Sequence, residues 1–108
     1  MYNYRRDKKL HRIYTLIKKE IKPLRIILFG SKAKGYSNTH SDYDILILLK
    51  DKKNEREITR KIYFTLLKNK ISEPVDIIVA EEEKYKKYKE TPGLIYKSVA
   101  KEGIEIKW

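Results

Sequence analysis

Three short runs of almost wholly apolar residues, at 24–29, 43–49 and 75–80, most limit how this chain can fold. Each run has the length of a strand rather than of a helix, and turn-forming or charged residues bound it. An apolar run without strict alternation is typical of a strand that is buried on both faces. The chain is therefore expected to form a sheet that is covered by other elements.

The segments on either side of these runs have the spacing of amphipathic helices. Residues 3–22 place apolar side chains three and four positions apart, and Pro23 ends that helix because proline cannot continue it. Residues 54–70 repeat the pattern, with Asn54 as the expected N-cap. The side chains expected to pack on the sheet are Leu10, Ile13, Tyr14, Ile17 and Ile21 from the first helix and Ile58, Ile62, Tyr63, Leu66 and Leu67 from the second.

Two further helices are expected near the end of the chain. Residues 81–90 predict a helix whose first glutamates, at 81–83, are solvated and favoured by the helix dipole. Residues 92–101 predict another, with Pro92 in its first turn and Gly103 just after its end. The alternation in 104–108 predicts an edge strand. The expected fold class is α/β, a small mixed sheet flanked by helices.

The size and composition of the chain limit its class. A sequence of 108 residues without repeats or linkers is expected to form a single domain over residues 1–108. The absence of cysteine excludes a disulfide scaffold, a thiolate zinc site and a cysteine nucleophile. No apolar run has the roughly 18 residues of a membrane-spanning helix, and the first residues are too charged for a secretory signal. A cytoplasmic protein is expected.

The chain is strongly basic, with 26 Lys and Arg against 15 Asp and Glu, a net charge of +11. Such an excess favours anionic partners, which include nucleotides, nucleic acid and acidic protein surfaces. The same lysine-rich composition is also typical of a hot-growing or AT-rich host. The basic residues are spread over most of the sequence, so charge alone does not identify the partner.

The second apolar run begins with two carboxylates, Asp42 and Asp44. Residues two apart on a strand share a face, with their Cα atoms about 6.5 Å apart, so both side chains can reach the same cation. Carboxylate and phosphate oxygens are the ligands that Mg²⁺ prefers. A pair of this kind is, by itself, more often a solvated turn than a metal site.

Gly30-Ser31 follows the first apolar run, where residues 31–41 predict a short helical turn and then a loop. Backbone N–H groups at such a junction point toward an incoming anion, and the Ser31 hydroxyl adds a donor. Glycine allows a phosphate to approach closely, and Lys32 and Lys34 supply mobile positive charge nearby. The alternative interpretation is a helix N-cap that follows a glycine turn.

A third carboxylate, Asp76, stands in the otherwise apolar run 75–80. Burying it there costs several kcal/mol unless a cation or donors compensate, and the alternative is an exposed position at the rim of the sheet. Three carboxylates and a phosphate-binding turn are the arrangement used with two Mg²⁺ ions in phosphoryl or nucleotidyl transfer.

Gly30-Ser31, ten residues and then Asp42-x-Asp44 resembles the signature of the DNA polymerase β-like nucleotidyltransferases. The likeness is strongest to their minimal members and extends over nearly the whole chain, which implies the polymerase β-like fold. It implies that Ser31 holds the triphosphate, that Asp42 and Asp44 bind both metals, and that Asp76 binds the catalytic metal and helps to activate the acceptor. Lys34 stands where many relatives have arginine, and lysine lacks the bidentate fork of arginine.

The resemblance also implies a role for the whole protein. Minimal nucleotidyltransferases of this kind are commonly antitoxins that transfer AMP from ATP to a tyrosine of a HEPN-domain RNase toxin. Such a small catalytic layer is expected to rely on a partner to hold the acceptor, and the basic surface offers a contact for RNA. Two alternatives remain open, a small-molecule nucleotidyltransferase and an antitoxin that acts by binding alone.

Overall fold

The computed structural model describes residues 2–35, 42–51 and 54–108 and contains a four-stranded mixed sheet. The strands are β1 (Arg25–Phe29), β2 (Tyr43–Leu49), β3 (Val75–Glu81) and β4 (Ile104–Glu105), in the order β3-β2-β1-β4. β1 is antiparallel to both β2 and β4, whereas β2 and β3 run parallel. The predicted mixed sheet, its α/β class and its short edge strand are therefore confirmed.

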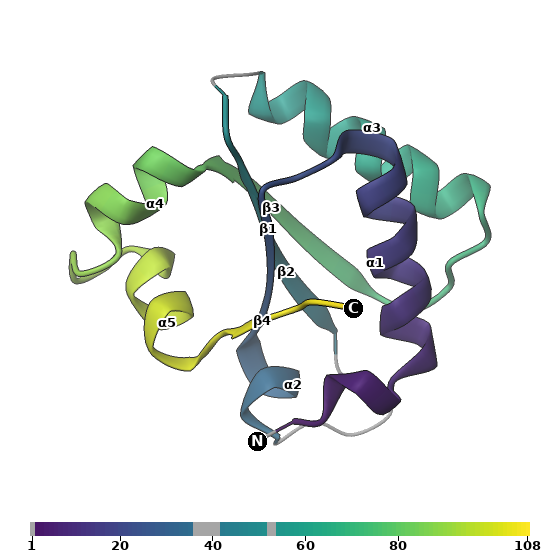
Figure 1. The fold of residues 1–108 in the computed structure, drawn as a ribbon, viewed down its shortest axis with the longest axis horizontal. Coiled ribbons are helices and arrows are strands. Elements are labelled where there is room, and N and C mark those ends of the chain that lie inside the picture. The colour runs from purple at the N-terminus through teal and green to yellow at the C-terminus, as the bar shows by residue number, and fades with distance from the viewer. Residues whose placement is uncertain (1, 36–41, 52–53) are drawn as a thin grey trace.

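Helices cover both faces of the sheet (Figure 1). α1 (Lys8–Ile21) and α3 (Glu55–Lys68) lie on one side, and α4 (Glu82–Tyr88) and α5 (Ile95–Glu102) lie on the other. The five-residue helix α2 (Gly30–Lys34) continues directly from β1. No helix in the part of the chain that the structure describes is long and apolar enough to cross a membrane.

β1, β2 and most of β3 are buried on both faces, as their continuous apolar runs predicted, whereas β4 is half-buried. Alternate residues of each strand enter two separate cores, because side chains on a strand point to opposite faces. The core beneath α1 and α3 includes Leu10, Ile13, Ile17, Ile26, Leu28, Ile45, Ile47, Ile62 and Leu66. The core beneath α4 and α5 includes Ile27, Phe29, Leu46, Leu48, Ala80, Tyr85, Tyr96 and Val99.

Two helix starts differ from the prediction. The first long helix begins at Lys8 rather than near residue 3, because the Asp7 carboxylate caps it by accepting from the Leu10 N–H at 3.0 Å. A separate 3₁₀ turn, Tyr4–Arg6, precedes it. The last helix begins at Ile95, so Pro92 lies in the preceding turn and not in the first helical turn.

Two predictions of burial were also wrong. In α3, Ile62 and Leu66 are buried, but Tyr63 and Leu67 are exposed, because only one column of the apolar stripe faces the sheet. Glu82 is buried rather than solvated, and its Oε1 lies 2.9 Å from Nη1 of Arg25. An opposite charge at this distance compensates for the loss of water around a carboxylate.

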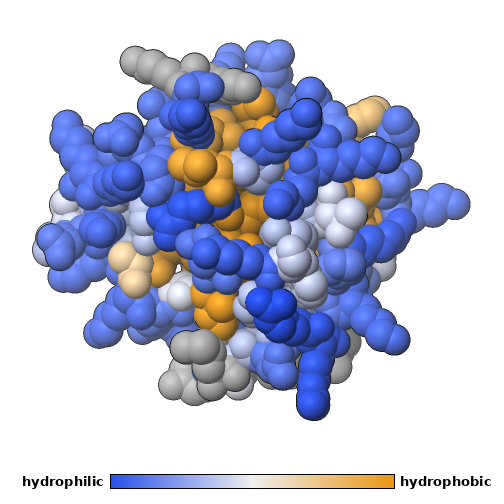
Figure 2. All heavy atoms as spheres, in the orientation of Figure 1, coloured by the Kyte–Doolittle hydropathy of each residue, from blue (hydrophilic) through white to orange (hydrophobic). Residues whose placement is uncertain are grey.

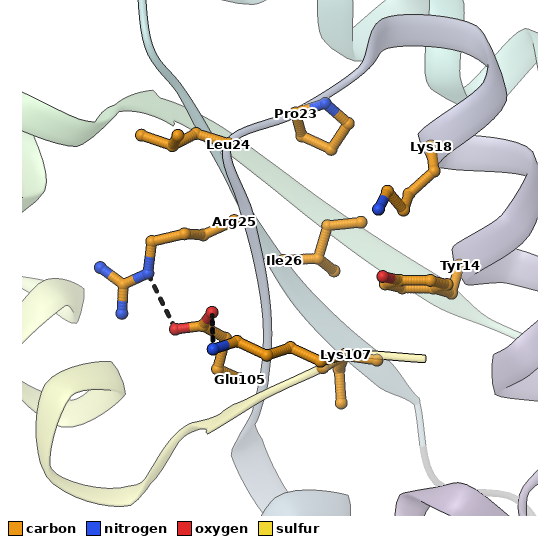
Figure 3. Close-up of a pocket in the computed structure, with 9 residues that line it drawn as sticks. Tyr14, Lys18, Pro23, Leu24, Arg25, Ile26, Glu105 and Lys107 are labelled. Carbon is orange, nitrogen blue, oxygen red and sulfur yellow. Dashed lines mark hydrogen bonds and ion pairs between the residues drawn. The ribbon is translucent and has the colours of Figure 1, made fainter.

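Hydrophilic side chains cover most of the face that is seen in Figure 2, and apolar side chains reach the surface mainly along its middle. A small hollow of about 110 Å³ opens beside the β1–β4 pair (Figure 3). Arg25 lines it and pairs with Glu105 at 2.9 Å. Arg25 is the first residue of β1, so this hollow lies at the far end of that strand from Gly30.

Candidate active site

One end of the sheet brings the predicted acidic residues together. Asp44 pairs with Phe29 of β1 on one side and with Asp76 of β3 on the other, so Asp44 and Asp76 are direct neighbours on parallel strands. Paired residues on parallel strands project from the same face, here the face that α4 and α5 cover. Asp42 is exposed and lies immediately before the first residue of β2. The end of β1 and the starts of β2 and β3 therefore form one edge.

The Asp44 carboxyl is partly buried and lies close to two other carboxyl groups. Burial, the negative charges of Asp76 and Asp42 and a hydrogen bond with Asp76 together raise its pKa to about 6. Like charges held this close favour a proton or a cation between them. The described residues contain no group of three His, Asp or Glu side chains arranged to hold a metal unaided.

Asp76 is exposed at the rim of the sheet, although the sequence suggested a buried carboxylate. It is the second residue of β3, and the apolar residues of that strand are buried only from Ile77 onward. The cost of burial therefore gives no reason to place a cation beside Asp76. The register of Asp76 with Asp44 is the stronger observation, because it puts two carboxylates side by side.

Gly30 lies directly against the Asp44 carboxylate. A Cβ built at Gly30 would collide with Oδ2 of Asp44 and would lie 3.0 Å from its Cγ. Gly30 also has a φ of +75°, a conformation that residues with a side chain rarely adopt. A side chain here would displace Asp44 and strain the backbone, and Ser31 follows Gly30 as an exposed residue of α2. The Gly-Ser turn and the acidic pair are therefore adjacent parts of one site.

The two lysines of α2 have different surroundings. Lys32 is only 7 % exposed, and its Nζ lies 4.5 Å from the centre of the Tyr43 ring, so it is not the mobile surface charge that the sequence suggested. Lys34 is exposed and pairs with Glu102 of α5 at 2.7 Å. Exposed ion pairs of this kind contribute little to stability, and their side chains readily change partners. A role in nucleotide binding stays a prediction for both lysines.

A polar cluster that the sequence did not reveal lies beneath the site. The Asp7 carboxylate accepts hydrogen bonds from the hydroxyls of Tyr2 and Tyr43, the latter at 2.9 Å. Tyr43 stands between Asp42 and Asp44 but points to the opposite face of the sheet. Burial alone would raise the pKa of Asp7, but these bonds, the Leu10 N–H and the charge of Lys32 lower it. Asp7 therefore ties the start of α1 to β2.

Asp7→Ala is expected to lower the free energy of unfolding at pH 7 by about 2 kcal/mol, because it removes an N-cap and the acceptor of two hydroxyls. Because the pKa of Asp7 is lowered in the folded state, its contribution to stability is fully present above the ordinary carboxyl pKa of about 4. That contribution is lost as the pH falls through the pKa of Asp7 in the folded protein. Urea unfolding of both proteins between pH 3 and about 7 measures the difference. Asn54→Ala removes only the cap of α3, so it should cost about 1 kcal/mol at every pH. An equal, pH-independent loss in both variants would contradict the role of Asp7.

The segment 36–41 lies outside the described residues, together with the turn that was predicted at Ser37-Asn38. The site is thus defined by Gly30, Asp42, Asp44 and Asp76, with the Ser31 side chain beside it.

Comparison with known families shows which protein family the chain belongs to. The model of the polymerase beta nucleotidyltransferase family matches residues 11–107, which is nearly the whole chain. The chain belongs to this nucleotidyltransferase family. The match includes both segments of the signature, Gly30-Ser31 and Asp42-x-Asp44, so the family resemblance inferred from those residues is confirmed. Comparison with curated protein sequences finds no match.

Solved structures agree with the fold of this nucleotidyltransferase. A crystal structure of a toxin-antitoxin with AMP-PNP is 22 % identical, with a TM-score of 0.59 over 91 % of this chain and 71 % of that one. A mutant of the toxin-antitoxin MntA-HpeT is 24 % identical, with a TM-score of 0.58 and the same coverage. A candidate nucleotidyltransferase from Sulfolobus solfataricus is 25 % identical, with a TM-score of 0.57 over 74 % of this chain and 70 % of that one. These similarities confirm the polymerase β-like fold.

Proposed function

We propose that this nucleotidyltransferase moves AMP from ATP onto a hydroxyl of a protein partner, namely a tyrosine of a HEPN-type toxin, and so acts as an antitoxin. The observation that carries the proposal is the contact of Asp44 with Gly30 on one side and Asp76 on the other. This arrangement joins a turn suited to phosphates with carboxylates suited to metal ions. Family membership makes nucleotidyl transfer the reaction class that fits them.

The residues at this edge fit divalent metal ions. Asp42 and Asp44 would hold two Mg²⁺ ions, for which Mn²⁺ can substitute, and Asp76 would share one of them. The raised pKa of Asp44 supports this assignment, because burial and the repulsion from Asp76 and Asp42 that cause it would be offset by a cation. When bound, such ions neutralise charge on the triphosphate and polarise the phosphorus under attack.

The other residues of the site have complementary roles in the proposed reaction. The backbone at Gly30 and the Ser31 hydroxyl would bind the β- and γ-phosphates, which leave together as pyrophosphate. The absent side chain at Gly30 lets the Asp44 carboxylate lie directly against the turn that would hold the triphosphate. Asp76 is exposed, so an acceptor hydroxyl can approach it from solvent and give up its proton there.

The choice of a protein acceptor rests on two further observations. Two of the similar solved structures are toxin-antitoxins, one of them with AMP-PNP. The net charge of +11 favours anionic partners such as ATP and an acidic protein surface, and it also permits contact with RNA. Together these observations favour an antitoxin over a transferase for small molecules.

The reaction class is tested with two labelled forms of ATP. The protein is incubated with Mg²⁺, a purified HEPN-domain protein and ATP that carries the label at either the α- or the γ-phosphate. The proposal predicts that only the α-label joins the partner and that the γ-label leaves as pyrophosphate. Transfer of the γ-label would indicate a kinase, and a labelled small molecule without labelled protein would indicate a small-molecule transferase.

Ser31→Ala is expected to weaken the use of ATP by about tenfold or more, because a hydrogen bond to a charged phosphate contributes about 1.5–3 kcal/mol. The loss should lie mainly in KM if the hydroxyl binds the ground state and the transition state equally. Steady-state kinetics with varied ATP measure it, and Ser98→Ala on α5 is a matched control with no expected effect. Wild-type kinetics in Ser31→Ala would reduce the Gly-Ser turn to a helix cap.

A further inference from the structure

The outer face of α3 exposes three large apolar side chains. Tyr63, Phe64 and Leu67, here called the α3 patch, are 40 %, 65 % and 75 % exposed. Residues three and four positions apart are neighbours on a helix surface, so these side chains form one apolar cluster and are not isolated exposed residues. The opposite side of the helix is already buried through Ile62 and Leu66. A clustered apolar surface of this kind marks a site of interaction.

The α3 patch forms a ridge between two hollows. One hollow, of about 370 Å³, opens between α1 and α3, with Leu16 and Phe64 in its lining. The other, of about 180 Å³, opens between α3 and the start of β3, with Tyr63, Leu67 and Val75 in its lining. A ridge that is flanked by grooves is the surface against which another helix packs well.

The second hollow borders β3, the strand that carries Asp76. The Tyr63 hydroxyl accepts a hydrogen bond from the Ile77 N–H at 2.8 Å, and Ile77 follows Asp76 directly. Val75, which lines the hollow, precedes Asp76. β3 is the outermost strand on this side, so the hollow and the exposed Asp76 open on the same edge of the sheet. Ile77 faces α3 whereas Asp76 faces the α4 and α5 side, so a partner on the α3 patch would reach Asp76 around the outer edge of β3.

The charges around the patch select the kind of partner. Residues 60–70 contain Arg60, Lys61, Lys68 and Lys70 and no acidic residue. Glu20, which pairs with Lys61 at 3.6 Å, and Glu73 line the two hollows, so positive charge still predominates around the patch. A second copy of the chain would bring the same positive charges to this surface and be repelled, whereas a partner with acidic residues would be attracted. Tyr63 and Phe64 have rings on which bases could also stack, whereas the most exposed member, Leu67, is aliphatic and packs better against apolar protein side chains. The surface therefore suits a protein.

We propose that the α3 patch is the docking surface for the acceptor protein, which contributes an apolar helix bordered by acidic residues. This inference rests on the proposed function for the identity of the acceptor. Docking buries Phe64 and Leu67, fills the hollow beside Val75 and presents the acceptor hydroxyl at Asp76. The patch acts through binding and takes no part in the chemistry.

The test compares two double variants that introduce the same charge at exposed apolar positions. Phe64→Asp with Leu67→Asp alters the α3 patch, and Leu94→Asp with Ile95→Asp alters α5, where the side chains are 42 % and 41 % exposed. Calorimetric titration of each with a purified HEPN-domain protein, without ATP, measures docking separately from catalysis. Binding should be at least about thirtyfold weaker in the patch variant, as expected for central apolar anchors, and unchanged in the α5 variant. Thermal unfolding and Mg²⁺–ATP binding should match the wild type in both.

The possible outcomes separate this inference from the proposed function. Equal affinity of the wild type and the patch variant, or no binding by the wild type, would overturn the docking surface. A wild-type dimer that dissociates in the patch variant, or loss of binding to single-stranded RNA with protein binding intact, would assign the patch to another partner and overturn it too. Weakened docking in the patch variant, together with a wild type that transfers no AMP, would support the surface and refute the proposed reaction.

Discussion

Simultaneous replacement of Asp42 and Asp44 by asparagine will reduce AMP transfer by at least about a thousandfold. If the two carboxylates hold the metal ions as proposed, their loss removes several kcal/mol of transition-state stabilisation, and about 4 kcal/mol corresponds to a factor of a thousand in rate. The amides keep the shape of the side chains but are much weaker ligands for Mg²⁺. Release of pyrophosphate and labelling of the acceptor by α-labelled ATP measure the effect.

The folded state of this double variant should be intact. The pKa of Asp44 is raised to about 6 by burial and by its acidic neighbours, so its contribution to stability is present near pH 4 and is lost as the pH rises through 6. Without metal at pH 7.5, the double variant should unfold at the same temperature as the wild type or slightly higher. Asp51→Asn, at an exposed position beyond the other end of β2, is the matched control and should retain full transfer. Full activity in the double variant would refute the role of these carboxylates.

Gly30→Ala will reduce transfer by about a hundredfold or more and lower the free energy of unfolding by about 1–3 kcal/mol. The new Cβ would collide with the Asp44 carboxylate, and the φ of +75° adds backbone strain of about 1–2 kcal/mol. Relief of the collision must move Asp44 or the turn, and either shift separates the carboxylates from the backbone that is proposed to bind the phosphates. Kinetics and urea unfolding measure the two losses.

Gly35→Ala tests the effect of backbone strain without a steric collision. Gly35 has a similar φ of +81°, but nothing lies within 4 Å of a Cβ placed there. This variant should lose about the same backbone contribution to stability while its transfer rate stays within a few-fold of the wild type. Equal activity losses in the two variants would show that the contact between Gly30 and Asp44 has no special role.

Sequence reasoning predicted the sheet better than the surfaces of the helices. The strand Tyr43–Leu49 has the predicted bounds, because its continuous apolar run is typical of burial on both faces. In α3 the same reasoning counted Tyr63 and Leu67 as buried. The spacing of apolar residues shows that a helix is amphipathic, but it does not show which of them face the sheet when the apolar face is wide. The two residues that were wrongly expected to be buried belong to the α3 patch.

The candidate site was predictable where its residues are close in sequence. Gly30-Ser31 and Asp42-x-Asp44 were evident as a pattern, whereas the pairing of Asp44 with Asp76 depends on strand register, which no local pattern specifies. The bond between Asp7 and Tyr43 joins residues 36 positions apart on different elements. Such contacts arise only when the elements pack together, so no local pattern in the sequence signals this cluster.

The most direct test of the proposed reaction is the intact mass of the partner. A purified HEPN-domain protein is incubated with this chain, ATP and Mg²⁺, and its mass is compared with that after incubation with the Asp42→Asn, Asp44→Asn variant. The proposal predicts a gain of one or more AMP units that maps to a tyrosine and is absent with the variant. A gain equal to phosphate, an unchanged partner, or an AMP gain that persists with the variant would contradict it.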